Sequence, residues 1–222
     1  SLTQIDIPSS ITTIEYYAFH GCSSLQKVTI PSTVTIIEAS AFEGCLSLFE
    51  VIIPSSVTEI KASAFNECSS LKNIKLTSSI KVIDEYAFSG CSSLTEIEIP
   101  SSLTEIKDYT FSGCSSLVNI KIPSSIEIIG GYGFSQCSSL EKVSLPNSVT
   151  EIKWNAFEDC SCLTKILIPS SVTSIGISAF SNCSSLSEVE FCDNSKLTLI
   201  GQNAFNGCSA LNQIKIPVSV EK

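Results

Sequence analysis

Cysteine is the residue whose type and spacing most suggest chemistry in this sequence. Eleven cysteines occur in 222 residues, and nine of them recur at an interval that is 23 residues seven times and 25 residues once. These nine are Cys22, Cys45, Cys68, Cys91, Cys114, Cys137, Cys160, Cys183 and Cys208. Regularly spaced thiols can form disulfides, bind zinc, carry out redox chemistry or pack as small apolar side chains in a core.

The spacing favours packing over the other uses. A side chain that returns once in every structural repeat stacks on its neighbour at about 4.8 Å, the distance between adjacent strands. A disulfide needs Cβ atoms about 3.5–4.5 Å apart in a turned geometry, and zinc sites usually contain close C-x-x-C pairs. The nearest pair here is Cys160 and Cys162. We therefore predict a ladder of buried free thiols; a disulfide framework, with at least one cysteine left unpaired, is the alternative.

The serines and the single histidine do not form a catalytic pattern. A serine nucleophile needs a neighbouring base, and His20 is the only histidine. A pair of His20 with Cys22 is conceivable, but Glu43 and Asn66 occupy the histidine position in the next two repeats, which indicates a surface loop. The many serine pairs are typical of turns, where their hydroxyls bond local backbone groups. We expect no catalytic residues, no cofactor and no metal site.

Charge and hydropathy exclude several classes of partner. The net charge is −9, and all thirteen basic residues are lysines. Arginine is the preferred side chain for phosphate and guanine, so nucleic acid is not an expected partner. No segment approaches the roughly 18 apolar residues of a membrane span, so we expect no membrane insertion by this segment. We see no targeting signal and no methionine, and we expect a piece of a longer protein.

The cysteines belong to a longer repeat, C-S-S-L-x-x-I-x-I-P-S-S-V-T-x-I-x-x-x-A-F-x-x. Nine phenylalanines keep the same period: Phe19, Phe42, Phe65, Phe88, Phe111, Phe134, Phe157, Phe180 and Phe205. The alternating L-x-x-I-x-I predicts a half-buried strand, and the proline and serines predict a turn after it. A second short apolar run, V-T-x-I, follows the turn. The residue before each phenylalanine is never larger than threonine, which indicates little space there.

A single repeat is too small to fold alone, because it becomes stable only when neighbours share a continuous core and backbone hydrogen bonds. The pattern therefore predicts a right-handed β-rich solenoid of about nine to ten coils over residues 1–222. We expect one parallel sheet along a face and short turns or 3-10 segments elsewhere. We also expect a single repeat array without caps of its own.

The repeat resembles the BspA-like leucine-rich-repeat family, whose unit is L-x-x-I-x-I-P-x-x-V-x-x-I-x-x-x-A-F-x-x-C, and the match covers the whole chain. There are two departures. Thr77 replaces the proline, and the segment "FCDNSKL" at 191–197 carries two extra residues, which we expect to form a small protrusion. The resemblance implies a curved horseshoe on a bacterial or protozoan surface that binds proteins or host cells. It therefore implies a cell-surface or extracellular location.

Two stripes on the predicted surface are candidates for partner binding. One lies on the outer face of the sheet, and the other lies just before the Ala-Phe pair, where large aromatic side chains recur at one-repeat spacing. The candidates are Phe49, Ile52 and Leu167 on the sheet face, and Tyr86, Tyr109, Tyr132 and Trp154 on the second stripe. Aromatic side chains with a polar tip are favoured interface anchors. The alternatives are a solvated sheet face and aromatics that only shield the edge of the core.

These observations predict a non-catalytic protein- or glycan-binding module of an adhesin-like surface protein, with a host-cell or matrix partner. A structural array that self-assembles through uncapped ends or edges, as a homo-oligomer, is the alternative. A polysaccharide-cleaving β-solenoid enzyme is a remote third reading. That enzyme would need clustered carboxylates, whereas Glu96 and Glu98 lie among lysines.

Overall fold

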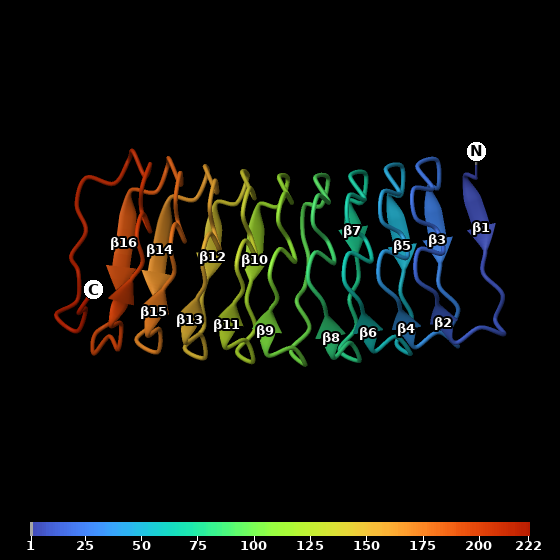
Figure 1. The fold of residues 1–222 in the computed structure, drawn as a ribbon, viewed down its shortest axis with the longest axis horizontal. Helices are drawn as coiled ribbons and strands as arrows, with labels where there is room; N and C mark the ends of the chain where they lie inside the picture. The colour runs from blue at the N-terminus through green and yellow to red at the C-terminus, as the bar shows by residue number, and fades with distance from the viewer. Residues whose placement is uncertain (1) are drawn as a thin grey trace.

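The computed structural model describes residues 2–222 as a long row of stacked coils, with the two chain ends at opposite ends of the row (Figure 1). The regular elements in these residues are 17 short strands, and the described part of the chain contains no helix. Each complete coil runs up one face, turns, and returns along a second face. The predicted solenoid architecture is confirmed.

The first face is formed by the alternating L-x-x-I-x-I segments. Its strands are β1 (Gln4–Asp6), β3 (Lys27–Thr29), β5 (Glu50–Ile52), β7 (Asn73–Ile74), β10 (Asn119–Lys121), β12 (Lys142–Ser144), β14 (Lys165–Ile168) and β16 (Glu188–Phe191). Neighbouring strands are parallel, and each residue pairs with the one 23 positions later, as Val28 does with Val51. In β3 only the central residue is buried, as the alternation predicts.

The second face is formed by the V-T-x-I segments. Its strands are β2 (Thr13–Ile14), β4 (Ile36–Ile37), β6 (Glu59–Ile60), β8 (Val82–Ile83), β9 (Glu105–Ile106), β11 (Ile128–Ile129), β13 (Glu151–Ile152), β15 (Ser174–Ile175) and β17 (Leu199–Ile200). These nine strands are also parallel and in the same register, as the pairing of Ile37 with Ile60 shows. The sequence analysis predicted only one sheet and missed this second ladder. Strands of two residues are too short to show an alternation of apolar and polar residues.

The direction in which the coils wind follows a general rule for parallel strands. A crossover between parallel strands is right-handed in about 98% of cases, because twisted strands pack back onto their sheet most readily in that sense. Right-handed winding of this solenoid stays a prediction.

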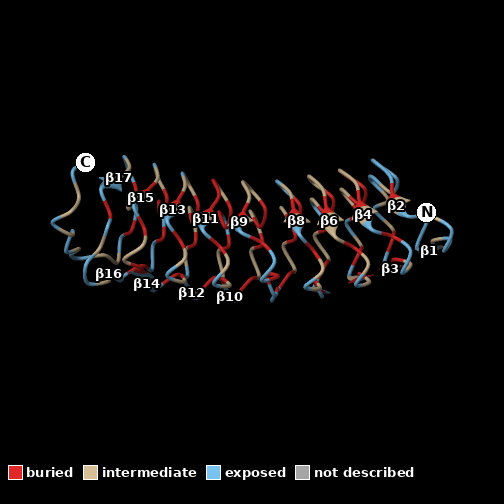
Figure 2. Ribbon diagram, turned by 90° about the horizontal axis from the view of Figure 1, so that it is seen from below, coloured by how far each residue is buried: buried red, intermediate tan, exposed pale blue. Residues whose placement is uncertain are grey.

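The core lies between the two faces and runs the length of the row, where Figure 2 shows the buried residues. Its largest members are the repeated phenylalanines, whose rings stack from coil to coil. The centroids of Phe42 and Phe65 are 5.3 Å apart, and their planes differ by 3°. The small residue before each phenylalanine is buried in every coil after the first, as Ala41 and Thr110 are, because coils pack against it on both sides. The tight space predicted at this position is confirmed.

The repeated cysteines hydrogen-bond to the backbone of the neighbouring coil. Each of eight thiols donates to the carbonyl oxygen of the phenylalanine one coil earlier, with Sγ–O distances of 3.1–3.3 Å. These eight are Cys45, Cys68, Cys91, Cys114, Cys137, Cys160, Cys183 and Cys208, and all are buried. Cys22, in the first coil, is half-buried. The predicted ladder of buried free thiols is therefore confirmed for eight of the nine positions, and the thiol also satisfies a buried carbonyl.

The two extra residues in 191–197 leave the neighbouring coils in register. Strand β16 ends at Phe191, which pairs with Ile168, and the backbone amide of Lys196 donates to the carbonyl of Ser170 at 3.0 Å. Leu199 then pairs with Ser174, 25 positions earlier, so the second face continues unbroken. The predicted protrusion between two regular coils is confirmed.

Both faces are interrupted at the same joint between coils. On the first face β7 and β10 belong to separate sheets, and Glu96–Glu98 between them is not a strand. On the second face β8 and β9 also belong to separate sheets. The backbone hydrogen bonds are stretched here. At the joint that both faces share, the Thr95 amide lies 3.4 Å from the Lys72 carbonyl, and one coil later the Val118 amide lies 3.5 Å from the Thr95 carbonyl. The equivalent bond a further coil on, from Glu141 to Val118, is 2.9 Å long.

The substitution of proline by Thr77 lies beside this joint. The Thr77 hydroxyl is buried and has no hydrogen-bond partner. The adjacent phenylalanine stack is also stretched, because the centroids of Phe88 and Phe111 are 5.8 Å apart. The joint is therefore looser than its neighbours on both faces and in the core.

We predict that alkaline pH destabilises the fold through its buried thiols. Burial raises the pKa of Cys45 and of Cys114 to about 12, whereas an exposed thiol titrates near 8.5. Above about pH 8.5 the unfolded chain loses protons that the folded chain keeps. The free energy of unfolding therefore falls by ~1.4 kcal/mol per pH unit for each buried thiol, until the folded pKa is reached. Urea unfolding at pH 8 and pH 10 measures this fall.

The control is the variant Cys114→Ala, which lacks one buried thiol. Its free energy of unfolding should fall with pH less steeply than that of the parent, by the ~1.4 kcal/mol per pH unit that one thiol contributes. In the native chain at pH 8, a thiol reagent should react quickly with exposed Cys162 and slowly with the buried ladder. In denaturant without reductant, all eleven thiols should react. A count of five or fewer, or an unchanged pH dependence in Cys114→Ala, would contradict the ladder.

We predict that Thr77→Pro stabilises the chain. The substitution removes an unpaired buried hydroxyl and restricts the unfolded chain, and both effects favour the folded state. We expect a gain of roughly 1 kcal/mol, which raises the melting temperature by about 2–4 °C in a chain of this size. Differential scanning calorimetry measures it, with Pro54→Thr as the matched reverse change in a regular coil. A lower melting temperature for Thr77→Pro would show that the joint requires threonine.

Candidate binding surface

The predicted aromatic stripe lies at a left-handed turn that recurs in the coils. Tyr86, Tyr109 and Tyr132 have φ values of 59°, 59° and 54°. The same position is held by serine in Ser40 and Ser63, also at positive φ. The amide of Tyr109 donates to the carbonyl of the following coil, at Gly131, with a length of 2.8 Å. The turn is therefore held by backbone bonds between coils, and its side chains project at one-coil spacing.

The three tyrosines form a continuous stack. The ring centroids of Tyr86 and Tyr109 are 4.4 Å apart and those of Tyr109 and Tyr132 are 4.6 Å apart, with nearly parallel planes. The pKa of the Tyr109 phenol is raised to about 12. The main cause is burial of the phenol, and the second is repulsion from the charge that Tyr86 and Tyr132 would carry when ionised. The Tyr109 phenol therefore stays neutral at physiological pH.

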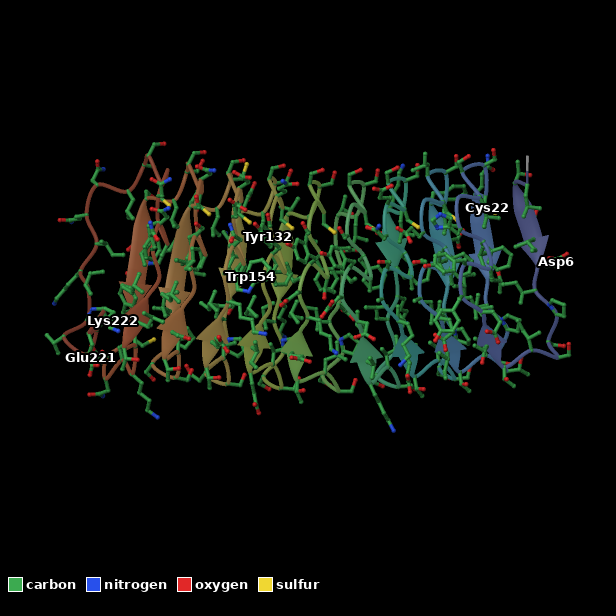
Figure 3. The ribbon with its side chains drawn as sticks, viewed as in Figure 1. Asp6, Cys22, Tyr132, Trp154, Glu221 and Lys222 are labelled. Atoms are coloured by element: carbon green, nitrogen blue, oxygen red, sulfur yellow. The ribbon has the colours of Figure 1, made fainter. Side chains whose placement is uncertain are left out.

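Trp154 packs against the side of the stack, with its ring centroid 6.0 Å from that of Tyr109. Its ring centroid lies 4.9 Å from that of Tyr132, with the planes at 82°, and Figure 3 shows the two side chains next to each other. A Cβ atom on Gly131 would lie 2.5 Å from Cε2 of the indole. Cε2 is shared by both rings of the indole, so another atom can approach it closely only from above or below the ring plane. Gly131 therefore lies against a face of the indole. Because Gly131 has no side chain, the indole of Trp154 can pack directly against its backbone.

Charged side chains line the same stripe. Asp108 accepts a hydrogen bond from the amide of Gly131 at 2.7 Å, and the ammonium of Lys153 lies 4.0 Å from the same carboxylate. Lys107 pairs with Asp84 across one coil at 3.0 Å. The hydrogen bond that Lys107 donates to this carboxylate is the main cause that raises the pKa of Lys107. The aromatic row thus has charges of both signs beside it.

The predicted candidates on the sheet face do not form one surface. Phe49 and Ile52 are close in sequence and are 44% and 45% exposed. Leu167 is 46% exposed, but it lies on β14, in a different sheet from β5. Next to Leu167, Lys165 contacts two carboxylates on the following strand, so that part of the face is dominated by charge. The structure therefore brings together the aromatic row, and it leaves Leu167 apart from Phe49 and Ile52.

The residues considered for catalysis or metal binding lie apart. His20 is exposed in a turn, and its Nδ1 lies 3.7 Å from the carboxylate of Glu43. In residues 2–222 no group of three or more histidine, cysteine, aspartate or glutamate side chains is arranged to hold a metal ion. In the same residues there is no helix with the length and apolarity for a membrane crossing.

An apolar groove beside Trp154 was not anticipated. It has a volume of about 690 Å³, and Ile177 and Leu199 line it together with Trp154. Its floor includes Gly176 and Gly201. One signal for it was present in the sequence, since these glycines occupy a position that is charged in most other coils, as in Lys61. Ile177 also follows Trp154 by one repeat at an exposed position.

A second, polar groove lies at the loosened joint on the first face. Its volume is about 720 Å³, and its lining includes Asn73, Lys75, Glu96, Asn119 and Lys121. The carboxylates and lysines in it alternate in sign, which is typical of a solvated sheet face.

The comparisons with known proteins identify the repeat. The family model described as "BspA type Leucine rich repeat region" matches residues 1–118 and 104–222, with six copies. The chain belongs to the BspA type leucine-rich repeat family. No protein with a curated description matches it significantly.

Solved structures of other leucine-rich repeat proteins are similar over most of the chain. A leucine rich repeat protein of T. pallidum is 34% identical, with 83% of this chain and 77% of that chain covered and a TM-score of 0.61. A protein of Bacteroides ovatus is 28% identical, covering 95% and 72%, with a TM-score of 0.52. A leucine rich cell surface protein of Faecalibacterium prausnitzii is 29% identical with a TM-score of 0.61. The match covers 88% of this chain and 60% of that protein.

We predict that Gly131→Ala displaces Trp154 in this BspA type repeat chain. The new Cβ would meet the indole at 2.5 Å, a distance at which one of them must move. Alanine itself fits this position in other coils, as Ala39 and Ala62 show. We expect a loss of about 1–3 kcal/mol in the free energy of unfolding, as overpacking causes, and a red-shifted tryptophan emission.

The control is a double-mutant cycle with Trp154→Ile, since Ile177 already occupies that position in the next coil. In the Trp154→Ile background, Gly131→Ala should have almost no effect on stability. An equal loss in both backgrounds would show that the strain comes from the backbone and not from the indole.

Proposed function

We propose that this chain is a non-catalytic binding module of a cell-surface protein, with a protein or a glycan as its partner. The observation that carries the proposal is the row of Tyr86, Tyr109, Tyr132 and Trp154 on consecutive coils, in which Tyr86 and Trp154 are exposed and the two tyrosines between them are half-buried. Such a row is rigid, large and polar at its tips, which are the properties of side chains that contribute most to binding.

The backbone at the row supports a functional reason for the tyrosines. A non-glycine residue at positive φ is unfavourable, and a bulky side chain there is rarer than asparagine. Serine and asparagine occupy this turn in other coils, as in Ser40 and Asn155. The turn recurs along the row of coils and serves the fold, so the unusual feature is the bulky side chain and not the backbone. Three successive tyrosines at this turn are therefore better explained by a partner than by the needs of the fold.

Two other findings support the proposal. The family consists of repeat proteins, whose regular coils supply an extended surface without a deep pocket. The Faecalibacterium prausnitzii relative is described as a cell surface protein, which supports the proposed location. Weak contacts spread over several coils can then add up to a useful affinity.

The test measures binding of the immobilised chain to purified extracellular-matrix proteins and to a panel of glycans. The main variant changes Tyr86, Tyr109 and Tyr132 to serine, the residue that this turn already accepts in Ser40. It should bind the partner at least tenfold more weakly, as loss of anchor residues does. Tyr17→Ser is the matched control, because Tyr17 lies at the same turn but outside the stack, and it should bind normally.

A second variant, Phe49→Thr with Ile52→Thr, tests the sheet face. Weaker binding by this variant alone would move the binding surface there and contradict the aromatic row. No binding of the parent chain to any protein or glycan would contradict the proposed function. Turnover of a substrate that depends on His20 or Cys162 would also contradict it. Analytical ultracentrifugation of the parent, with a large assembly as the result, would favour the self-assembling array instead.

A further inference from the structure

The groove beside Trp154 has the properties of a small-molecule site. Its volume of about 690 Å³ lies within the range of about 300–1,000 Å³ that is usual for such sites. Its walls are apolar, formed by Trp154, Ile177 and Leu199, which are 39%, 56% and 40% exposed. Large apolar side chains that stay exposed together usually mark a binding surface.

The indole of Trp154 is held in place before any ligand arrives. One of its faces rests on Gly131, and Tyr132 and Tyr109 contact it with their planes at 82° and 72°. Trp154 lines the groove and Gly131 does not, from which we infer that the opposite face of the indole is turned towards the groove. A ligand therefore meets a flat aromatic surface that needs no rearrangement, which lowers the entropy lost on binding.

Two glycines line the groove at points where neighbouring coils approach each other closely. A Cβ on Gly176 would lie 2.4 Å from the backbone nitrogen of Trp154, and a Cβ on Gly201 would lie 2.5 Å from the carbonyl carbon of Gly176. In other coils this position carries a charged side chain, as in Asp84 and Lys107. Without such side chains, the space next to the indole is free.

Polar side chains lie around the apolar walls. The carboxylate of Glu151, the ammonium of Lys153, the hydroxyl of Ser174 and the amide of Gln202 all line the groove. They supply both hydrogen-bond donors and acceptors. Glu151 carries a negative charge and Lys153 and Lys222 carry positive charges, so groups of both signs line the groove.

We propose that this groove binds a neutral pyranose ring of a glycan, an inference that rests on the binding function proposed above and specifies its ligand. A pyranose has one face of C–H groups with partial positive charge, and the face of an aromatic ring carries partial negative charge. Its hydroxyls project from the edge of the ring, where Glu151, Lys153 and Gln202 can hydrogen-bond to them. An apolar protein side chain would use the walls but would leave these polar groups without partners.

Trp154 is the only tryptophan in the chain, so its fluorescence reports directly on this groove. The probes are neutral oligosaccharides of hexoses and N-acetylhexosamines, first as an array and then in titrations of the parent chain. We expect a saturable change in tryptophan emission and matching calorimetric binding. Trp154→Ala, which the fold accepts at this position in Ala39 and Ala62, should lower the affinity at least tenfold.

A second variant keeps Trp154 and fills the groove. Ser174→Ile introduces the residue that Ile36 and Ile128 already place at this position, so the coil should fold normally, and the oligosaccharide should bind at least tenfold more weakly. Tyr17→Ser, at the same left-handed turn but outside the aromatic row, is the matched control and should bind the sugar as the parent does. Sugar binding that survives both Trp154→Ala and Ser174→Ile would overturn the groove as the site.

The two proposals fail in different ways. If the parent binds a matrix protein through the aromatic row but no neutral oligosaccharide changes the tryptophan emission, the glycan site is wrong and the binding function stands. If only acidic glycans bind, and they bind equally well to Trp154→Ala, the proposed ligand class and site are both wrong. If neither proteins nor glycans bind, the proposed function itself fails.

Discussion

Register between neighbouring coils is the constraint on which the other features of this molecule depend. Backbone amides donate to the preceding coil on both faces, and at the left-handed turns they donate to the following coil, as Tyr109 does to Gly131. These bonds work only if each coil repeats the same backbone path. The buried columns then follow, because a phenylalanine or a cysteine always meets its counterpart in the next coil. The thiol of each buried cysteine adds a further bond to the phenylalanine carbonyl of the preceding coil.

The same register creates the candidate binding surface. Residues 23 positions apart lie side by side, so the three tyrosines, separated by 22 intervening residues each, become a stack with ring centroids 4.4–4.6 Å apart. Trp154 is one position earlier in its repeat, and it reaches the stack only because Gly131 leaves room on the preceding coil. A function that needs rigid aromatic groups thus uses contacts that the fold already enforces, and little additional ordering is required on binding.

Departures from the repeat have different consequences according to where they occur. The two extra residues in 191–197 fall in a turn between the faces, and the pairing on both sides continues. Thr77 replaces a proline beside a strand, and both ladders are interrupted at the adjacent joint. A turn can lengthen without disturbing the inter-coil bonds, whereas a change at the end of a strand alters the bonds themselves. The loosened joint therefore divides the row into two more regular parts.

Except for the runs at 94–99 and 211–216, which form no strands, the sequence by itself determined the first-face strands. It also determined the repeat length, the solenoid, the buried thiols and the membership of the tyrosines in one row. All of these follow from periodicity, because identical residues at identical spacing must occupy equivalent environments. The tertiary structure decided the rest. The second ladder has only two residues per coil and leaves no pattern to detect, and Leu167 lies far from Phe49 although both occupy exposed positions of the sheet. The groove beside Trp154 arises where residues from different coils differ from the consensus together, as Gly131, Gly176 and Ile177 do. Periodicity predicts what the coils share, whereas a site built from their differences depends on distances that only the packed coils define.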